Sequence, residues 1–451
     1  MRETTTIRAK FAHFLTILIP ILITQAGLSL ITFLDTVMSG KVSAEDLAGV
    51  AIGSSLWTPV YTGLAGILMA VTPIVAQLMG ANQKEDVPRA VLQALYLSLL
   101  LSVVVILIGM TAVPHILGGL GLEQSVIVIS EGFLRFLAIG IIPLFGYSVM
   151  RSFIDALGKT RVTMVITLSA LPINFVLNYL LIFGKFGFPA LGGAGAGLAS
   201  ALTYWAIFLI SVWIVMKAEP FTSFHLFQTF PRFNPSRIGQ ILKIGLPIGF
   251  AIFFETSIFA AVTLFMGHFD TVTIASHQAA MNFASILYIL PLGISMALTI
   301  VVGYEVGAKR YQDAKQYSYL GIGTAVLFSL CTAGIIMLLR PEIAGLYTTD
   351  SAVLHMTQQF LIYAIFFQLS DAVAAPIQGA LRGYKDVNYT LIAAFVSYWV
   401  IGLPVGYFIG TYTSFGAFGY WIGLIAGLAT GAIVLFGRLR LIEKRYQKQH
   451  A

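Results

Sequence analysis

Long apolar segments separated by short polar breaks set the pattern of this chain. Residues 247–267 are typical, because they form one apolar stretch that is interrupted by a single carboxylate, Glu255. A helix of roughly 20 apolar residues is long enough to cross about 30 Å of hydrocarbon. Similar stretches recur along the sequence and predict an all-α polytopic membrane protein with twelve transmembrane helices. The predicted spans are residues 11–39, 46–79, 88–113, 125–149, 162–183, 190–216, 238–267, 273–305, 314–339, 351–380, 387–410 and 416–437.

The first and second halves of the chain repeat each other at one constant offset. The aligned pairs are Pro20 and Pro247, Gly40 and Gly267, Gly66 and Gly293, Met69 and Met296, Thr72 and Thr299, and Gly80 and Gly307. With six spans each, both halves enter the membrane in the same sense. We therefore expect two homologous six-helix lobes related by a pseudo-two-fold axis along the membrane normal, with a cavity between them. The predicted division is an N-terminal lobe of residues 1–216, a cytoplasmic linker of residues 217–243 and a C-terminal lobe of residues 244–451.

Charged residues are few and unevenly placed. Hydrophobic residues make up 58% of the chain and charged residues 10%, a composition typical of membrane proteins. Lys and Arg gather at the two termini and in the loops after every second span, whereas the opposite loops hold only Lys41, Lys185 and Arg340. By the positive-inside rule this predicts a multi-pass protein of the cell membrane with both termini in the cytoplasm. The net charge of +7 then reflects topology and contact with the lipid bilayer, and we expect no nucleic acid as a partner.

Three carboxylates lie well inside predicted spans: Asp35 in the first, Glu255 in the seventh and Asp371 in the tenth. A charge at the bilayer centre costs on the order of 2.5–3.5 kcal/mol even on lenient insertion scales, so such acids usually face an ion or substrate pathway. No Lys or Arg lies within helical reach of any of them in the sequence. The alternative is a buried acid that neighbouring hydroxyl groups satisfy. Three such acids together favour coupling to a cation.

Two amides on the fifth span are further candidates. Asn174 and Asn178 follow Pro172 and stand four residues apart, so they share one face of a helix. With a carboxylate, they could form an oxygen-rich site for a hard cation or a proton relay. Hydrogen bonding between helices explains them equally well.

The eighth span raises the same question with Ser276, His277, Gln278 and Asn282. A lone histidine in such a place is more often a packing residue than a ligand. Glu131 and Arg135 stand at i and i+4 with the acid first, which predicts an ordinary helical ion pair.

Several chemistries are not supported by the sequence. Residues 158–160 read Gly-Lys-Thr as in a P-loop, but Phe153 occupies a position where that motif needs glycine, so we expect no nucleotide. The seven histidines are scattered, and the single cysteine, Cys331, allows no intrachain disulfide. No spacing suggests zinc or a nucleophile with its base. We therefore expect a protein that is not an enzyme and needs no cofactor.

Four segments carry a resemblance to a known family. They are residues 34–40 (LDTVMSG), 253–255 (FFE) and 276–278 (SHQ), and Asp371 followed by residues 381–386 (LRGYKD). In order and spacing they resemble the multidrug and toxic compound extrusion (MATE) transporters of the NorM branch. The likeness extends over nearly the whole chain. It implies export of hydrophobic, often cationic drugs and dyes by antiport against Na⁺ or H⁺, with alternating access between two lobes.

The resemblance also implies roles for single residues. The coupling acids of the C-terminal lobe map onto Glu255 and Asp371, and this pair favours Na⁺ as the ion bound there, although the sequence does not decide between Na⁺ and H⁺. The N-terminal set maps onto Asp35, Asn174, Asn178 and Thr203; some relatives have an acid in place of Asn178, which argues against a sodium site centred on Asp35. The expected substrate cavity comprises Asp35, His277, Gln278, Asn282 and Phe367.

Two other transport functions and a non-transport one stay open at this point. A lipid-linked saccharide flippase of the same superfamily should have a strongly basic cavity, which these spans lack. An ion channel should conduct current without countertransport. A receptor or scaffold would transport nothing and would leave three buried acids without a role.

Overall fold

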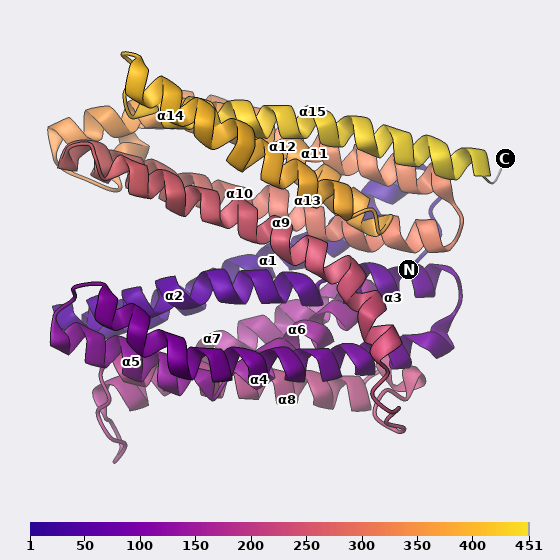
Figure 1. The fold of residues 1–451 in the computed structure, drawn as a ribbon. Helices are drawn as coiled ribbons and strands as arrows, with labels where there is room; N and C mark the ends of the chain where they lie inside the picture. Colours follow the sequence, from indigo (N-terminus) through magenta and orange to yellow (C-terminus); the bar gives the residue numbers. More distant parts are fainter. Residues whose placement is uncertain (450–451) are drawn as a thin grey trace. The chain divides into compact units, whose positions relative to one another are not determined.

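The computed structural model describes residues 1–449 and is almost entirely helical (Figure 1). The helices of the first half are α1 (Ile7–Gly40), α2 (Ala44–Leu68), α3 (Val71–Gly80), α4 (Val87–Gly119), α5 (Gln124–Ala138), α6 (Ile141–Ala156), α7 (Thr160–Phe183) and α8 (Gly193–Lys217). Those of the second half are α9 (Pro235–Met266), α10 (Thr271–Gly307), α11 (Tyr311–Gly345), α12 (Ser351–Gly383), α13 (Asn388–Phe395), α14 (Leu403–Tyr412) and α15 (Phe418–Gln449). A π-helical turn, Val396–Gly402, joins α13 to α14, and short 3₁₀ turns lie at Lys84–Asp86 and Phe221–Phe224.

The predicted all-α polytopic fold is confirmed. Within the described residues, 11 helical segments are long and apolar enough to cross a bilayer, and there are 12 spans if α5 and α6, which are bent by 52° at their junction, count as one. Two of the spans are broken just before a proline. Pro73 and Pro143 lie near the starts of α3 and α6, and each lacks the N–H that would bond to the carbonyl four residues earlier, Met69 or Ile139. Those two residues are where α2 and α5 end.

The chain forms two compact units that exchange the ends of two helices. The N-terminal unit comprises Met1 and residues 19–249. The C-terminal unit comprises residues 2–18 and 250–451. The start of α1 thus belongs to the second unit, and the start of α9 belongs to the first. The predicted lobes 1–216 and 244–451 rest on the internal repeat of the sequence and stay a prediction.

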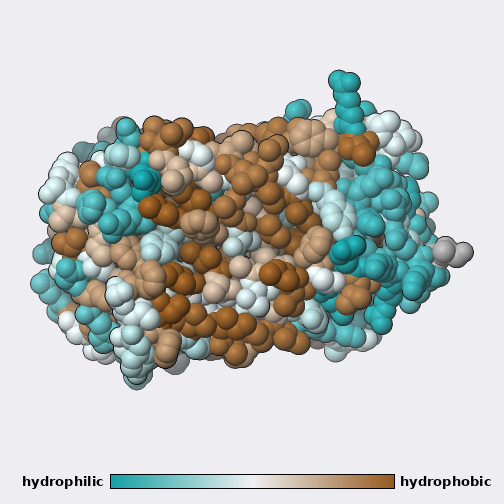
Figure 2. All heavy atoms as spheres, turned by 90° about the horizontal axis from the view of Figure 1, so that it is seen from above, coloured by the Kyte–Doolittle hydropathy of each residue, from teal (hydrophilic) through white to brown (hydrophobic). Residues whose placement is uncertain are grey.

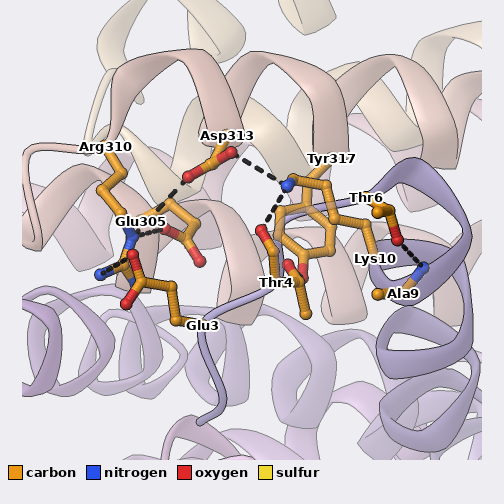
Figure 3. Close-up of polar contacts among 9 residues, drawn as sticks. All are labelled: Glu3, Thr4, Thr6, Ala9, Lys10, Glu305, Arg310, Asp313 and Tyr317. Carbon is orange, nitrogen blue, oxygen red and sulfur yellow. Dashed lines mark hydrogen bonds and ion pairs between the residues drawn. The ribbon is translucent and has the colours of Figure 1, made fainter.

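Polar contacts hold the beginning of the chain within the C-terminal unit (Figure 3). The Lys10 ammonium, which is almost fully buried, lies 3.0 Å from a carboxylate oxygen of Asp313 and donates a 2.7 Å hydrogen bond to the carbonyl of Thr4. The hydroxyls of Thr4 and Tyr317 are 3.0 Å apart. A buried charge is stable only when it is paired and hydrogen-bonded, and Lys10 has both kinds of partner.

The predicted linker of residues 217–243 is packed against the N-terminal unit. Phe221, Phe224 and Leu226 are buried in the hydrophobic core of that unit. The Tyr96 hydroxyl of α4 donates to the carbonyl of Pro231, and the Gln93 amide donates to the carbonyl of Arg232. The segment is therefore fixed to one unit by side chains.

Apolar side chains also cover much of the outside of the units. Figure 2 looks onto the side of the C-terminal unit where α14 and α15 lie: hydrophobic residues gather across its middle, and hydrophilic residues gather at the end where the C-terminal residues lie. Ile433 of α15 and Phe408 of α14 are among the exposed residues, at 73% and 60% exposure. Exposed apolar surface of this extent is expected of a helix that faces lipid.

Candidate functional site

The first candidate site lies inside the N-terminal unit around Asp35. Helix α1 supplies this aspartate, α7 supplies Asn174 and Asn178, and α8 supplies Ser200 and Thr203. The Asn178 and Asn174 amides donate to the same oxygen of Asp35 at 2.9 and 3.3 Å, and the Ser200 hydroxyl donates to the other oxygen. Asp35 is 7% exposed and both asparagines are fully buried. The structure therefore brings the predicted residues of this site together.

The donors around Asp35 match an ionised carboxylate. Charge-assisted hydrogen bonds of this kind replace the water that burial removes. One acceptor in the site lacks a donor: no residue among 1–449 makes a hydrogen bond to the buried Asn178 Oδ1. The Asn174 Oδ1 accepts from Asn178, and Thr203 is 3.5 Å from the Asn174 amide. The site therefore holds a negative charge beside a free amide oxygen, a combination that suits a small cation.

The second candidate site lies inside the C-terminal unit around Glu255. The Gln378 amide of α12 donates a 2.7 Å hydrogen bond to one oxygen of Glu255, which comes from α9. Asp371 lies two helical turns before Gln378, is 9% exposed, and is close enough to Glu255 for the two charges to interact. Two neighbouring carboxylates repel each other, so a cation or a proton stabilises the pair.

A basic residue and two phenols surround this acid pair. Arg382, one turn after Gln378 on α12, is buried and interacts electrostatically with Glu255. The phenol groups of Tyr288 on α10 and Tyr398 in the π-helical turn interact electrostatically with both acids. Within residues 1–449, no Lys or Arg forms an ion pair with Asp35, Glu255 or Asp371. The three acids are thus not neutralised by a fixed salt bridge.

The π-helical turn positions part of this site. Its Trp399 donates the indole N–H to the carbonyl of Phe254, the residue before Glu255. Short π-helical insertions are frequent at functional sites because they redirect side chains out of the regular α-helical register. Pro404 follows the turn and removes one donor from the ordinary helical ladder. The structure thereby connects this irregular turn to the backbone next to the acid.

The remaining candidates for a substrate cavity do not form one cluster. His277 is fully buried, its Nδ1 accepts from the Trp421 indole at 2.9 Å, and its Nε2 lies 3.3 Å from the Thr263 hydroxyl. Phe367 is also buried, 5.7 Å from Phe259 between ring centroids. Both side chains make packing contacts inside the C-terminal unit, and their assignment to a substrate cavity stays a prediction.

Gln278 and Asn282 lie on another face of α10 and are exposed. Asn282 accepts a 2.8 Å hydrogen bond from the Tyr347 hydroxyl. The assignment of Gln278 and Asn282 to a substrate cavity stays a prediction.

The predicted ion pair of Glu131 and Arg135 is confirmed at 3.0 Å, and the arginine side chain is largely exposed.

Sequence reasoning did not assign a role to several residues of the two sites, which are Ser200, Tyr288, Gln378, Arg382 and Tyr398. On α12 a signal was present, because Asp371, Gln378 and Arg382 are spaced by seven and four residues and therefore share one helical face. Ser200 gave no signal, since a serine in an apolar helix usually bonds to its own backbone. Only the packing of α8 against α7 places its hydroxyl beside Asp35.

Comparisons with known proteins agree with this architecture. The MatE family profile matches residues 20–180 and again residues 247–408, so the two matched ranges begin at the offset of the internal repeat. A probable multidrug resistance protein NorM of Bacillus subtilis (strain 168) is 70% identical over 451 residues, which is 100% of both chains. A protein of the same description from Bacillus licheniformis is 70% identical over 446 residues, covering 99% of each chain. The crystal structure of the eukaryotic MATE transporter AtDTX14 has the same fold, with a TM-score of 0.88 at 19% identity over 98% of both chains.

Proposed function

Because the chain belongs to the MatE family, we propose that it exports hydrophobic, often cationic drugs and dyes across the cell membrane by antiport against an inorganic cation. The two close relatives described above are named as multidrug resistance proteins. Both termini lie in the cytoplasm in this proposal, and neither a cofactor nor a nucleotide takes part. The energy for export comes from the cation gradient.

The buried acids Glu255 and Asp371 carry this proposal. A ligand moves a conformational equilibrium only if it binds the two states with different affinity. An inorganic cation that neutralises this pair removes their mutual repulsion and so favours the state in which they are close together. A cationic drug attracted by the same charges competes with it, and competition of this kind couples the two movements.

The amide of Gln378 supplies a mechanism for cation entry. In the structure its N–H donates to Glu255, which stabilises a carboxylate without a cation. Rotation of the amide by half a turn would direct its oxygen toward the acid, and that oxygen would then be a ligand for Na⁺ beside the carboxylate oxygens. A proton on Glu255 would instead let the carboxyl group donate to this amide oxygen. Arg382 disfavours an additional positive charge and so favours release of the cation in one of the two states.

Drug efflux in proteoliposomes tests the coupling assignment. We expect Glu255→Gln and Asp371→Asn each to reduce gradient-driven dye export by at least tenfold, while the surface variant Glu131→Gln retains it. Each of the three substitutions removes one carboxylate. The comparison therefore separates the effect of losing a carboxylate at the site from the effect of losing one elsewhere in the protein. Full export by both site variants would contradict the proposal.

Imposed gradients identify the coupling ion. The acid pair with an amide oxygen favours Na⁺, so an inward Na⁺ gradient at equal pH on both sides should drive export. A pH gradient without Na⁺ should drive it less. Export driven by the pH gradient alone would assign the site to H⁺. Ionic current across a voltage-clamped bilayer without drug exchange would instead indicate a channel.

A further inference from the structure

We propose that the N-terminal unit binds an anionic phospholipid of the cytoplasmic leaflet, with the lipid phosphate in a cavity between the start of α4 and residues 231–237. The cavity has a volume of about 440 Å³. Its lining consists of Arg89, Gln93, Pro231, Arg232, Phe233, Asn234, Pro235 and Arg237. None of these residues belongs to the sites around Asp35 and Glu255, so the inference is independent of the transport mechanism.

A buried glutamine holds the two sides of the cavity together. Gln93 of α4 is 1% exposed, donates to the carbonyl of Arg232 at 2.8 Å and accepts from the amide of Asn234 at 3.1 Å. The Tyr96 hydroxyl, one turn further along α4, donates to the carbonyl of Pro231 at 2.7 Å. These bonds join segments that are distant in sequence. The arginine backbones are thus fixed before any ligand binds, which lowers the entropy cost of binding.

The lining carries three positive charges and no negative one. Among residues 1–449, Asp86 is the one acid that forms an ion pair with a lining arginine, at 3.9 Å from Arg89. No ion pair of Arg232 or Arg237 occurs within the part of the chain that the structure describes. The Asn234 side chain caps the amides of Ser236 and Arg237 at the start of α9, so the guanidinium groups supply the binding. Arginine donates two parallel hydrogen bonds to phosphate, which makes a phosphate group the fitting ligand.

An exposed apolar stripe on α4 favours a lipid over a soluble phosphate as the ligand of this cavity. Arg89, Gln93 and Tyr96 share one face of α4, and the same face continues at helical spacing through Leu100, Val103 and Leu107. These three apolar side chains are exposed at 49%, 41% and 59%. Phe233 in the lining is exposed as well, at 53%.

A ligand with a phosphate at one end and acyl chains at the other matches this arrangement along its length. The charge distribution of the sequence predicts that this end of α4 faces the cytoplasm. Basic pockets beside membrane helices on that side attract the anionic lipids of the inner leaflet.

Native mass spectrometry of the detergent-purified full chain tests the proposal. Phosphatidylglycerol and phosphatidylcholine with identical acyl chains are titrated separately. The double variant R232Q/R237Q removes two lining charges, and R161Q/R445Q removes two arginines outside the cavity as a matched control. We expect R232Q/R237Q to raise the apparent Kd for phosphatidylglycerol roughly tenfold, since each arginine beside an anionic lipid surface contributes to affinity. Its affinity for phosphatidylcholine should not change, and the control should behave as the wild type.

Two further measurements make the outcome decisive. R232K/R237K keeps the charges but loses the two-pronged hydrogen bonds, so its Kd should lie between those of the wild type and R232Q/R237Q; this variant also serves if the glutamine pair does not fold. Inorganic phosphate and glycerol phosphate are then added as competitors. Displacement of the lipid by either one at equimolar concentration would show a soluble-anion site and overturn the proposal. Equal binding of phosphatidylglycerol by wild type and R232Q/R237Q would overturn it as well.

Discussion

The nitrogen and the oxygen of the Asn178 amide have different surroundings. Its nitrogen donates to Asp35, while its oxygen has no hydrogen-bond partner among residues 1–449. A buried acceptor without a donor costs on the order of 1–3 kcal/mol. That cost disappears if a cation enters and the oxygen becomes a ligand. We therefore expect any binding of a cation at this site to depend on the Asn178 amide oxygen.

Substitution of this amide by an acid gives the first prediction. Asn178→Asp places a second carboxylate within hydrogen-bond distance of Asp35, and two such charges are stable only with a shared proton or a bound cation. We expect the variant to unfold at a higher temperature in NaCl than in choline chloride of equal concentration. The wild type should show a smaller difference. An Asn178→Ala variant is the control, because it removes the same hydrogen bond without adding charge. Equal Na⁺ dependence of the aspartate and alanine variants would contradict the prediction.

For single residues, the sequence identified the charged and imidazole side chains, which are rare inside membrane spans. It did not identify a serine, which is common there. Asp35, Glu255 and Asp371 were found because a charge inside an apolar span is costly. His277 was found for the same reason, yet Trp421 and Thr263 satisfy it, and neither partner could be identified from spacing. Ser200 went unnoticed, since its role depends on which helix lies opposite.

Close helix contacts determine how the elements of the C-terminal unit fit together. A Cβ atom on Gly427 of α15 would lie 2.1 Å from the carbonyl oxygen of Ser397 in the π-helical turn. Small residues permit such approaches between membrane helices. The turn that carries Tyr398 and Trp399 is therefore held against α15 through a glycine.

The second prediction compares two glycines of the same helix. Gly427→Ala forces α15 away from the π-helical turn and should destabilise the unit by about 1–3 kcal/mol, the usual range for overpacking. Gly437→Ala is the matched control, because a Cβ there has no other atom within 4 Å. It should be neutral or slightly stabilising, since alanine is the better helix former. Thermal unfolding in detergent measures both, and equal effects would refute the role assigned to Gly427.

The third prediction concerns the ion pair that holds the start of α1. Asp313→Ala leaves the buried Lys10 ammonium with the Thr4 carbonyl as its remaining partner shown in Figure 3, and removal of one partner of a buried pair costs roughly 3–5 kcal/mol. Lys10→Met removes the charge and keeps most of the volume, while Asp313 still has Arg310 at 3.8 Å. We therefore expect a lower unfolding temperature for Asp313→Ala than for Lys10→Met. The reverse order would contradict the prediction, because it would show that loss of Lys10 destabilises the protein more than loss of Asp313.

Hydropathy predicted the spans because membrane helices must be long and apolar, and proline explains where two of them break. The exchange of helix ends between the two units was not predictable in the same way. Residues 2–18 are held by a buried lysine, whose position at the start of the chain looks like an ordinary positive-inside signal. A charge pattern indicates a side of the membrane, whereas the partner of each charge depends on the tertiary structure.

For the whole molecule, the sequence predicts which side of the membrane each loop faces. Lys and Arg residues concentrate at the ends of the spans that share a side with both termini, and the opposite loops hold few. In an antiporter the cation gradient sets the direction of exchange, so the position of this basic side in the cytoplasm is a separate prediction. This orientation can be measured without transport.

The single native cysteine makes that measurement direct. In a Cys331→Ser background, Lys84→Cys and Lys185→Cys each introduce one exposed thiol, in loops predicted to lie on opposite sides. A membrane-impermeant maleimide added to intact cells should label the thiol at position 185 and leave the thiol at position 84 unlabelled. Permeabilised cells should show labelling of both, which controls for reactivity. Labelling of position 84 alone in intact cells would place the basic side outside and would contradict the predicted orientation.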